Sequence, residues 1–110
     1  MYFVYMLRCA GDTLYTGITT DLSRRLAQHQ GQRSGGAKYT ASHPPRSVAM
    51  VWQAPSHAAA ARLEWQIKRL SRQEKERLIR EPAGLCSLCP PPEGGEYRPC
   101  PELTGPLNPV

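Results

Sequence analysis

The 110-residue sequence has no long hydrophobic run. A membrane-spanning helix needs about 18 or more consecutive apolar residues, and no stretch of the chain approaches that length. The N-terminus has neither a basic leader nor an apolar core of signal-peptide length, because Arg8 interrupts the first apolar run. We therefore expect a cytoplasmic protein that binds no membrane.

Cysteine is scarce in the part of the sequence with globular character. Of the four cysteines, Cys9 lies in a predicted strand and the other three lie in residues 81–110. This distribution is a poor framework for disulfides, so we expect reduced thiols. Cys86 and Cys89 have the spacing of zinc ligands, with Cys100 as a third candidate. A structural zinc site needs four ligands, which favours thiols that bind no metal.

Acidic residues are few in residues 1–80, which hold 13 lysines and arginines against 5 aspartates and glutamates. Residues 81–110 hold 1 basic residue against 4 acidic ones, together with eight of the 11 prolines. We predict a basic domain over residues 1–80 and a proline-rich tail over residues 81–110 that is extended or disordered. A compact domain this basic most often binds nucleic acid, and a basic surface without a partner is the alternative.

The first 17 residues have the pattern of a β-hairpin with a glycine-containing loop at residues 10–12. A three-residue loop sets the register so that Tyr5 lies opposite Gly17. Because side chains alternate between the two faces of a strand, Tyr5 and Tyr15 then share a face as diagonal neighbours, about 7–8 Å apart. Gly17 is expected to leave open space beside Tyr5 for a ligand group.

An amphipathic helix is predicted directly after the hairpin. Leu22 and Leu26 are four residues apart and form its buried row. At about 100° per residue, Arg25 and His29 form a second row at the border of the buried face. We therefore expect these two polar side chains to reach the same region as the hairpin tyrosines.

Residues 30–45 are rich in glycine, serine and basic side chains, and their composition predicts a loop. Within it, Lys38 and Tyr39 are candidates to hold a phosphate or to stack on a base, and an ordinary surface connection is about equally supported. His43 is expected to be a solvated loop residue. The β-branched and aromatic content of residues 47–53 predicts a third strand beside the hairpin.

Two helices are predicted next, over residues 58–70 and over residues 71–80. Glu64 lies at the margin of the apolar stripe of the first of them. A carboxylate at such a place is costly unless a positive or hydrogen-bonding group meets it. Lys68, four residues further on, is one candidate partner, and a divalent cation is the other. The residues alone support both equally.

Together these residues resemble the GIY-YIG nuclease domain over residues 2 to about 80. Residues 3–5 (FVY) stand in the place of the first triplet and residues 15–17 (YTG) in the place of the second. Arg25 and His29 match the arginine and histidine of the following helix, and Glu64 matches the metal-binding glutamate of a later one. The small stand-alone members and the structure-specific branch are the most similar.

The resemblance implies an α/β fold with a small three-stranded antiparallel sheet flanked by helices. It also implies a metal-dependent endonuclease that hydrolyses DNA phosphodiester bonds with one Mg²⁺ or Mn²⁺ ion. Tyr5 is then the expected general base, Tyr15 a positioning group or second base, Arg25 the phosphate ligand, His29 a proton relay and Glu64 the metal ligand. The expected substrate-binding residues are Gly17, Lys38 and Tyr39.

The expected setting is DNA repair or recombination. The substrate would be branched, damaged or otherwise irregular DNA, or a protein partner would direct unselective cleavage. One alternative is a nucleic-acid-binding module of the same fold that does not cleave. A glutamate that binds metal would distinguish the nuclease from this module. Another alternative is an interaction protein that binds a partner through its tail. In that case, deletion of residues 81–110 would abolish binding of the partner and would not affect any activity on DNA.

Overall fold

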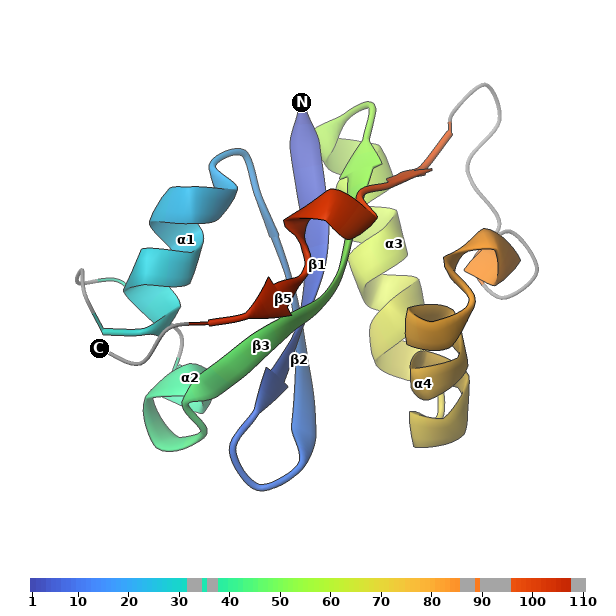
Figure 1. Cartoon of the computed structure of the whole chain (residues 1–110). Coiled ribbons are helices and arrows are strands. Elements are labelled where there is room, and N and C mark those ends of the chain that lie inside the picture. The colour runs from blue at the N-terminus through green and yellow to red at the C-terminus, as the bar shows by residue number, and fades with distance from the viewer. Residues whose placement is uncertain (32–34, 36–37, 86–88, 90–95, 108–110) are drawn as a thin grey trace.

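The computed structural model describes residues 1–31, 35, 38–85, 89 and 96–107. An antiparallel sheet lies at its centre, with helices on both sides (Figure 1). The three main strands lie in the spatial order β2-β1-β3 and confirm the predicted antiparallel sheet. They are β1 (Tyr2–Cys9), β2 (Thr13–Thr19) and β3 (Pro45–Ala54). The helices are α1 (Leu22–His29), α2 (Lys38–Ser42), α3 (His57–Arg69) and α4 (Arg72–Arg80).

The hairpin of β1 and β2 has the predicted register. Tyr5 pairs with Gly17, and Leu7 pairs with Tyr15. The loop between the strands turns at a glycine and an aspartate with positive φ angles of 80° and 56°, a region that glycine adopts most easily. Tyr5 and Tyr15 therefore lie on the same face of the sheet, as the alternation of side chains predicts.

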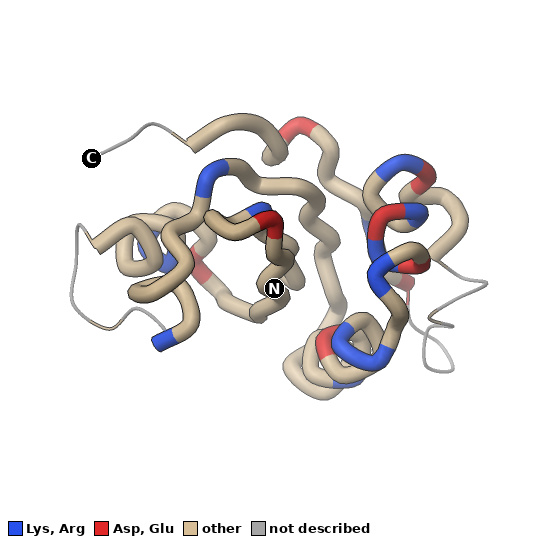
Figure 2. Tube along the Cα trace, turned by 90° about the horizontal axis from the view of Figure 1, so that it is seen from below, with Lys and Arg blue, Asp and Glu red and all other residues tan. Residues whose placement is uncertain are grey.

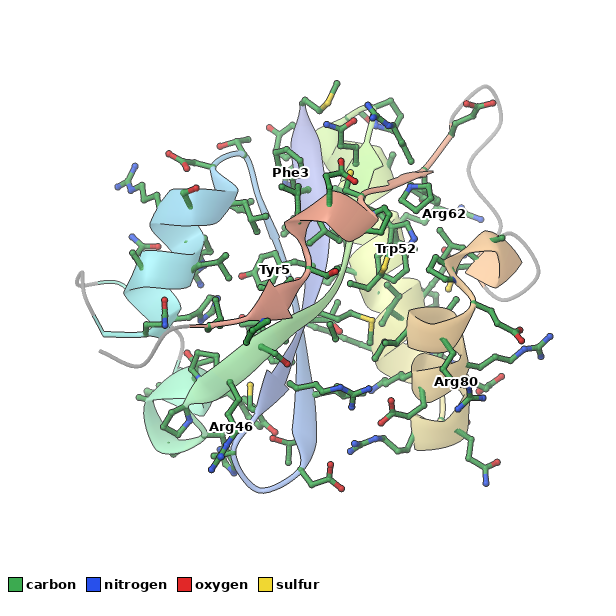
Figure 3. The ribbon with its side chains drawn as sticks, in the orientation of Figure 1. Phe3, Tyr5, Arg46, Trp52, Arg62 and Arg80 are labelled. Atoms are coloured by element: carbon green, nitrogen blue, oxygen red, sulfur yellow. The ribbon has the colours of Figure 1, made fainter. Side chains whose placement is uncertain are left out.

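The sheet separates two hydrophobic clusters. Val4 and Met6 of β1 pack with Trp52 of β3 beneath α3 and α4. Tyr5 and Leu7 face the other way and pack with the α1 side of the molecule. Figure 3 shows this division, with Tyr5 on the α1 side and Trp52 on the α3 side. The candidate tyrosines consequently belong to the smaller cluster, between the sheet and α1.

Side-chain caps define the starts of the three longer helices. Asp21 accepts a hydrogen bond from the backbone N–H of Arg24 at 3.1 Å and caps α1. Ser56 caps α3 in the same way, and Ser71 and Glu74 form a capping box at the start of α4. Each such cap typically stabilises a helix by about 1 kcal/mol. None of the helices in the described ranges is both long enough and apolar enough to cross a membrane.

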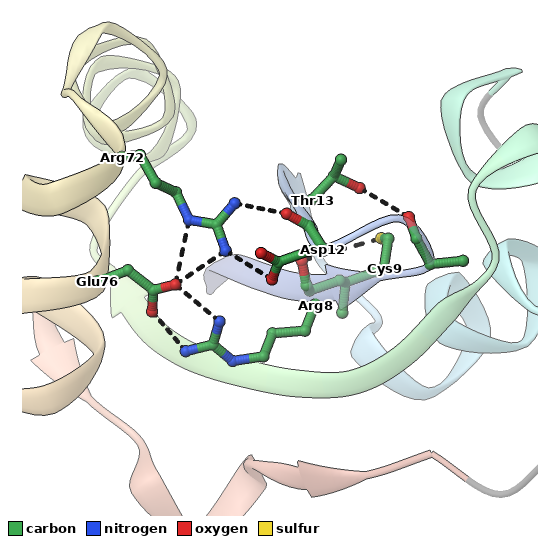
Figure 4. A network of polar contacts seen from close by, with 8 residues as sticks. Arg8, Cys9, Asp12, Thr13, Arg72 and Glu76 are labelled. Carbon is green, nitrogen blue, oxygen red and sulfur yellow. Dashed lines mark hydrogen bonds and ion pairs between the residues drawn. The ribbon is translucent and has the colours of Figure 1, made fainter.

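A network of charged side chains joins α4 to the hairpin (Figure 4). Glu76 accepts two hydrogen bonds from Arg8, at 3.0 and 2.5 Å. Arg72 donates to Glu76 and also to Asp12 in the hairpin loop. The Arg8 guanidinium lowers the pKa of Glu76 to about 2, and Arg72 adds to this effect. The network fixes α4 against the turn between β1 and β2.

Two short strands from the predicted tail extend the sheet to five strands. These strands, β4 (Arg98–Pro99) and β5 (Gly105–Pro106), both pair with β3. Cys100, between them, is buried and donates its backbone N–H to the carbonyl of Val51 at 2.8 Å. The Tyr97 hydroxyl donates to a backbone carbonyl of α3 at 2.9 Å. Proline is compatible with such edge strands, and the three-stranded prediction missed both of them.

Residues 30–45 contain a helix where the sequence predicts only a loop. This helix is α2, and Thr40 in its centre is buried. The cysteines Cys89 and Cys100 are buried in different clusters on the two sides of the sheet, so these two do not share a site. Cys86, the remaining candidate zinc ligand, lies outside the described residues.

Candidate functional site

A buried chain of hydrogen bonds links β1, α1 and α2. The Tyr5 hydroxyl lies 2.6 Å from His29 Nε2, and His29 Nδ1 lies 2.8 Å from Thr40 Oγ1. The three residues are 0%, 4% and 2% exposed. Both ring nitrogens of His29 therefore have partners, which fixes the orientation of the imidazole. Sequence reasoning placed Tyr5 near His29 but did not predict the bond to Thr40.

Burial keeps both ionisable members of this chain uncharged at neutral pH. Burial, together with the positive charge of Arg25, lowers the pKa of His29 to about 4. Burial raises the pKa of Tyr5, and its interaction with Arg25 only partly opposes this. A neutral imidazole has one donor and one acceptor nitrogen. The hydroxyls of Tyr5 and Thr40 consequently play opposite roles, one donating to the ring and the other accepting from it.

Aromatic rings connect this buried chain to the surface. The Tyr15 ring centroid lies 6.3 Å from that of Tyr5 and 5.0 Å from that of His29. Tyr15 stacks with Tyr39 at 5.9 Å, and Tyr39 stacks with His43 at 4.4 Å. Tyr39 is 36% exposed. His43 lies in the bend after α2, as predicted for a loop residue, but its ring is only partly exposed because it stacks on Tyr39.

Gly17 makes room for Tyr5 itself. A Cβ atom at this position would lie 2.5 Å from the Tyr5 hydroxyl oxygen and 2.7 Å from Cζ of the same ring. The open space expected beside Tyr5 is therefore filled by its own phenol. Gly17 instead allows the phenol to reach His29.

Arg25 brings a positive charge to the edge of the tyrosine cluster. Its Nη1 donates to Gln28 Oε1 at 3.0 Å and to the carbonyl of Gly35 at 2.6 Å. Partial burial disfavours the charged guanidinium, but interactions with the hydroxyls of Tyr5 and Tyr15 outweigh it and raise the pKa of Arg25. The guanidinium therefore stays charged and lies next to both phenols.

Glu64 lies on α3, a helix that contacts both β1 and β2. Its carboxylate is 3.4 Å from Lys68 Nζ, and its side chain is 26% exposed. The lysine partner predicted from the spacing is therefore present. The negative charge of Glu64 also contributes to the raised pKa of Tyr5. This contribution is the smallest of those that act on Tyr5, because α3 packs on the opposite side of the sheet from the tyrosine cluster.

The carboxylate oxygens of Glu64 are suited to bind a divalent cation such as Mg²⁺. The described residues contain no group of three or more His, Cys, Asp or Glu side chains placed to hold a metal. Mg²⁺ is often held by one or two carboxylates and keeps several water ligands. The partly exposed carboxylate of Glu64 meets this requirement, since an i,i+4 pair with lysine contributes only a few tenths of a kcal/mol.

Lys38 and Tyr39 form the first turn of α2 and are both exposed. Their contact with substrate stays a prediction. Thr40, which follows them, is the residue that sequence reasoning missed. No local pattern marks a threonine that will bond to a histidine eleven residues earlier.

Two phenols, an imidazole and a guanidinium thus meet on one face of a small antiparallel sheet, with a carboxylate on a later helix. This combination of fold and site defines a nuclease-like class of domain. The model of the GIY-YIG catalytic domain family matches residues 1–77. The chain belongs to the GIY-YIG catalytic domain family.

Its relatives include UPF0213 proteins from bacteria and archaea. One from Vibrio cholerae is 48% identical over 90 residues, which cover 79% of this chain and 82% of the relative. One from Natronomonas pharaonis is 43% identical over 83 residues, which cover 76% and 95% of the two chains. The solution NMR structure of a UPF0213 protein from Bacillus halodurans is 34% identical, covers 73% of this chain and 84% of that chain, and has a TM-score of 0.47.

Proposed function

We propose that the protein is a divalent-metal-dependent endonuclease that hydrolyses phosphodiester bonds of DNA. The observation that carries this proposal is the convergence of Tyr5, Tyr15, His29 and Arg25 in one cluster. Glu64 lies on α3, a helix that contacts both strands of the hairpin. Membership of a family of nuclease-like catalytic domains supports nucleic acid as the class of substrate.

Glu64 would hold one Mg²⁺ or Mn²⁺ ion through its carboxylate. Such an ion supplies charge neutralisation on the phosphate and eases departure of the sugar oxygen. Lys68 would give up its contact with Glu64 when the cation binds. The contact is weak enough for this exchange, since the lysine side chain is 55% exposed and exposed ion pairs contribute about 0–1 kcal/mol.

Arg25 would bind the scissile phosphate. Its planar guanidinium suits phosphate oxygens, and its hydrogen bonds to Gln28 and Gly35 hold it at the edge of the tyrosine cluster. A fixed positive charge at this point stabilises the negative charge that develops on the phosphate during attack by water.

Tyr15 is the better candidate for the base that accepts a proton from the attacking water. It is half-buried, and its hydroxyl interacts with the Arg25 guanidinium, which would bind the scissile phosphate. The water oxygen would bond to phosphorus while the bond to the leaving sugar oxygen breaks, and that oxygen would take a proton from solvent. Tyr5, the expected base, would be a positioning residue, because its fully buried hydroxyl is bonded to His29. His29 would orient Tyr5.

The expected substrate is branched, damaged or otherwise irregular DNA, in repair or recombination. A chain of this size has little surface beyond the site with which to recognise a long sequence, so selectivity would come from DNA structure or from a protein partner that directs cleavage.

The test incubates the purified protein with supercoiled and branched DNA, with and without Mg²⁺ or Mn²⁺. We expect nicking only with metal, and its loss in Glu64→Ala and in Arg25→Ala. Arg24→Ala is the matched control, because this neighbouring arginine is exposed and lies about 100° around the helix from Arg25. Binding without nicking, unchanged in Glu64→Ala, would support the non-cleaving module instead, an alternative that the existing Glu64–Lys68 pair favours.

A further inference from the structure

An exposed tryptophan lies among cations on the solvent side of α3. Trp65 is 60% exposed, and the guanidinium of Arg69 lies 4.7 Å from its ring centroid. We call the surface formed by the exposed residues Arg62, Trp65, Lys68 and Arg69 the α3 outer face. Arg62 lies on the α3 side of the sheet, away from Tyr5 (Figure 3). Neither the core nor the proposed reaction uses these aromatic and guanidinium groups.

Helix geometry explains why this face has no role in packing. At about 100° per residue, Trp65 points almost opposite Leu63 and Ile67, which are fully buried against the sheet. The three basic residues of the α3 outer face all lie within about 60° of Trp65. Since α3 has one acidic residue, Glu64, which pairs with Lys68 at the border of this face, the side chains of α3 around the indole are predominantly basic. Figure 2 shows basic residues on α3, and basic and acidic residues interspersed on α4.

The α3 outer face begins at the edge of the candidate site. Lys68 belongs to this face and contacts the carboxylate of Glu64 at 3.4 Å. Trp65 follows Glu64 directly in the chain and lies about 100° further around the helix. A strand whose phosphate reaches Glu64 would therefore meet the indole within one turn of the same helix.

We propose that the α3 outer face binds an unpaired strand of nucleic acid, with Trp65 stacked on a base and Arg62 and Arg69 beside the phosphates. Every base has a π face on which an indole can stack, and the guanidinium groups of Arg62 and Arg69 complement the phosphate backbone. This inference rests on the proposed function and deepens it, because it makes a single-stranded segment part of the substrate.

Other partners fit the α3 outer face less well. A helix that lies in a membrane surface needs a broad apolar face, and the aliphatic residues Leu63 and Ile67 of α3 are buried instead. The centre of a protein interface is depleted in charge, whereas here a single indole is surrounded by three cations. Bases and phosphates together match an aromatic ring flanked by guanidinium groups.

The chain provides its own reporter for this contact. It has two tryptophans, and Trp52 is fully buried while Trp65 is exposed. The experiment titrates the full chain with an oligothymidylate of about 12 nucleotides, a length within the range that single-strand-binding domains cover, in EDTA so that no cleavage can occur. We expect quenching of the tryptophan emission and protection from iodide, and a much smaller effect with a blunt duplex.

Three variants separate stacking from charge. Trp65→Ala should weaken binding, followed by fluorescence anisotropy of a labelled oligonucleotide, by about 5- to 100-fold, as for other stacked bases. Trp65→Phe should retain most of the affinity and lose the emission change, because Trp52 alone remains. Arg69→Ala should weaken binding more than Arg46→Ala, which removes the same charge at an exposed position on β3.

The outcome is distinguishable from that of the cleavage test. Quenching in EDTA and in Glu64→Ala would support the strand-binding face even if the protein never nicks DNA. Equal affinity of Trp65→Ala and the parent, or equal quenching by duplex and single strand, would overturn it. An emission shift with vesicles of anionic lipid but not with the oligonucleotide would assign the face to a membrane. If Trp65 became protected from iodide as the protein concentration rose without any oligonucleotide, the α3 outer face would instead bind a second copy of the chain.

Discussion

Gly17 and Tyr5 face each other across β1 and β2, and the missing side chain at position 17 lets the phenol reach His29. In Gly17→Ala the new Cβ would lie 2.5 Å from the phenol oxygen, so the ring must move and its bond to His29 is lost. We expect the free energy of unfolding to fall by about 1–3 kcal/mol, measured by urea denaturation. Gly84→Ala is the control, because nothing lies within 4 Å of its Cβ position. Equal losses in the two variants would contradict the explanation.

His29 makes stability depend on pH in a defined window. Its pKa is about 4 in the folded protein, below its ordinary value of 6.5, so the unfolded chain binds the extra proton first. The stabilisation is complete above pH 6.5 and is lost as the pH falls toward 4, by up to about 3 kcal/mol. Urea denaturation at several pH values measures this slope. His29→Gln should have a lower free energy of unfolding at pH 7, and this free energy should no longer fall between pH 6.5 and 4. An unchanged pH dependence in this variant would show that other groups cause it.

At the scale of elements, the docking of α4 depends on the ion pair between Arg8 and Glu76. Glu76 has a pKa of about 2, mainly because Arg8 donates to it, so the pair stabilises the fold above pH 4.5 and loses its effect as the pH falls toward 2. The Arg8 side chain is 38% exposed, and solvent screening limits the coupling to about 0.5–1 kcal/mol. A double-mutant cycle with Arg8→Gln and Glu76→Gln measures it. The coupling should be present at pH 7 and much smaller at pH 2, where about half of the Glu76 carboxylates are protonated, and equal values would refute the pair.

The elements that sequence patterns predict are those with a local cause. Leucine spacing and caps predict α1, α3 and α4 because hydrogen bonds and apolar contacts within a few residues define them. The five-residue α2 lies in a segment rich in glycine and serine, and its buried Thr40 is held by contact with α1. Such a helix has no periodic pattern of its own, so composition predicts a loop there.

At the scale of the whole molecule, the sequence predicts the part of the candidate site that local geometry determines and misses the rest. Alternation along the hairpin brings Tyr5 and Tyr15 to one face, and helical spacing brings Arg25 and His29 toward them, so simple geometry anticipates this cluster. Contacts between distant segments follow no local rule. The bond from His29 to Thr40 and the bonds from Arg8 to Glu76, 68 residues apart, appear only when the chain is folded.

Residues 96–107 illustrate how a tail without a sequence pattern becomes part of a small core. Cys100 and Leu107 pack on the α1 side of the sheet, and the Tyr97 hydroxyl bonds to the backbone of α3. Removing residues 96–110 would expose this surface and the edge of β3, and we expect the free energy of unfolding to fall by about 2–4 kcal/mol. Denaturation of this truncated chain is compared with that of a chain lacking only residues 108–110. If both truncations are as stable as the full chain, residues 1–95 carry the fold alone and residues 96–110 are free for another task, such as capture of a protein partner.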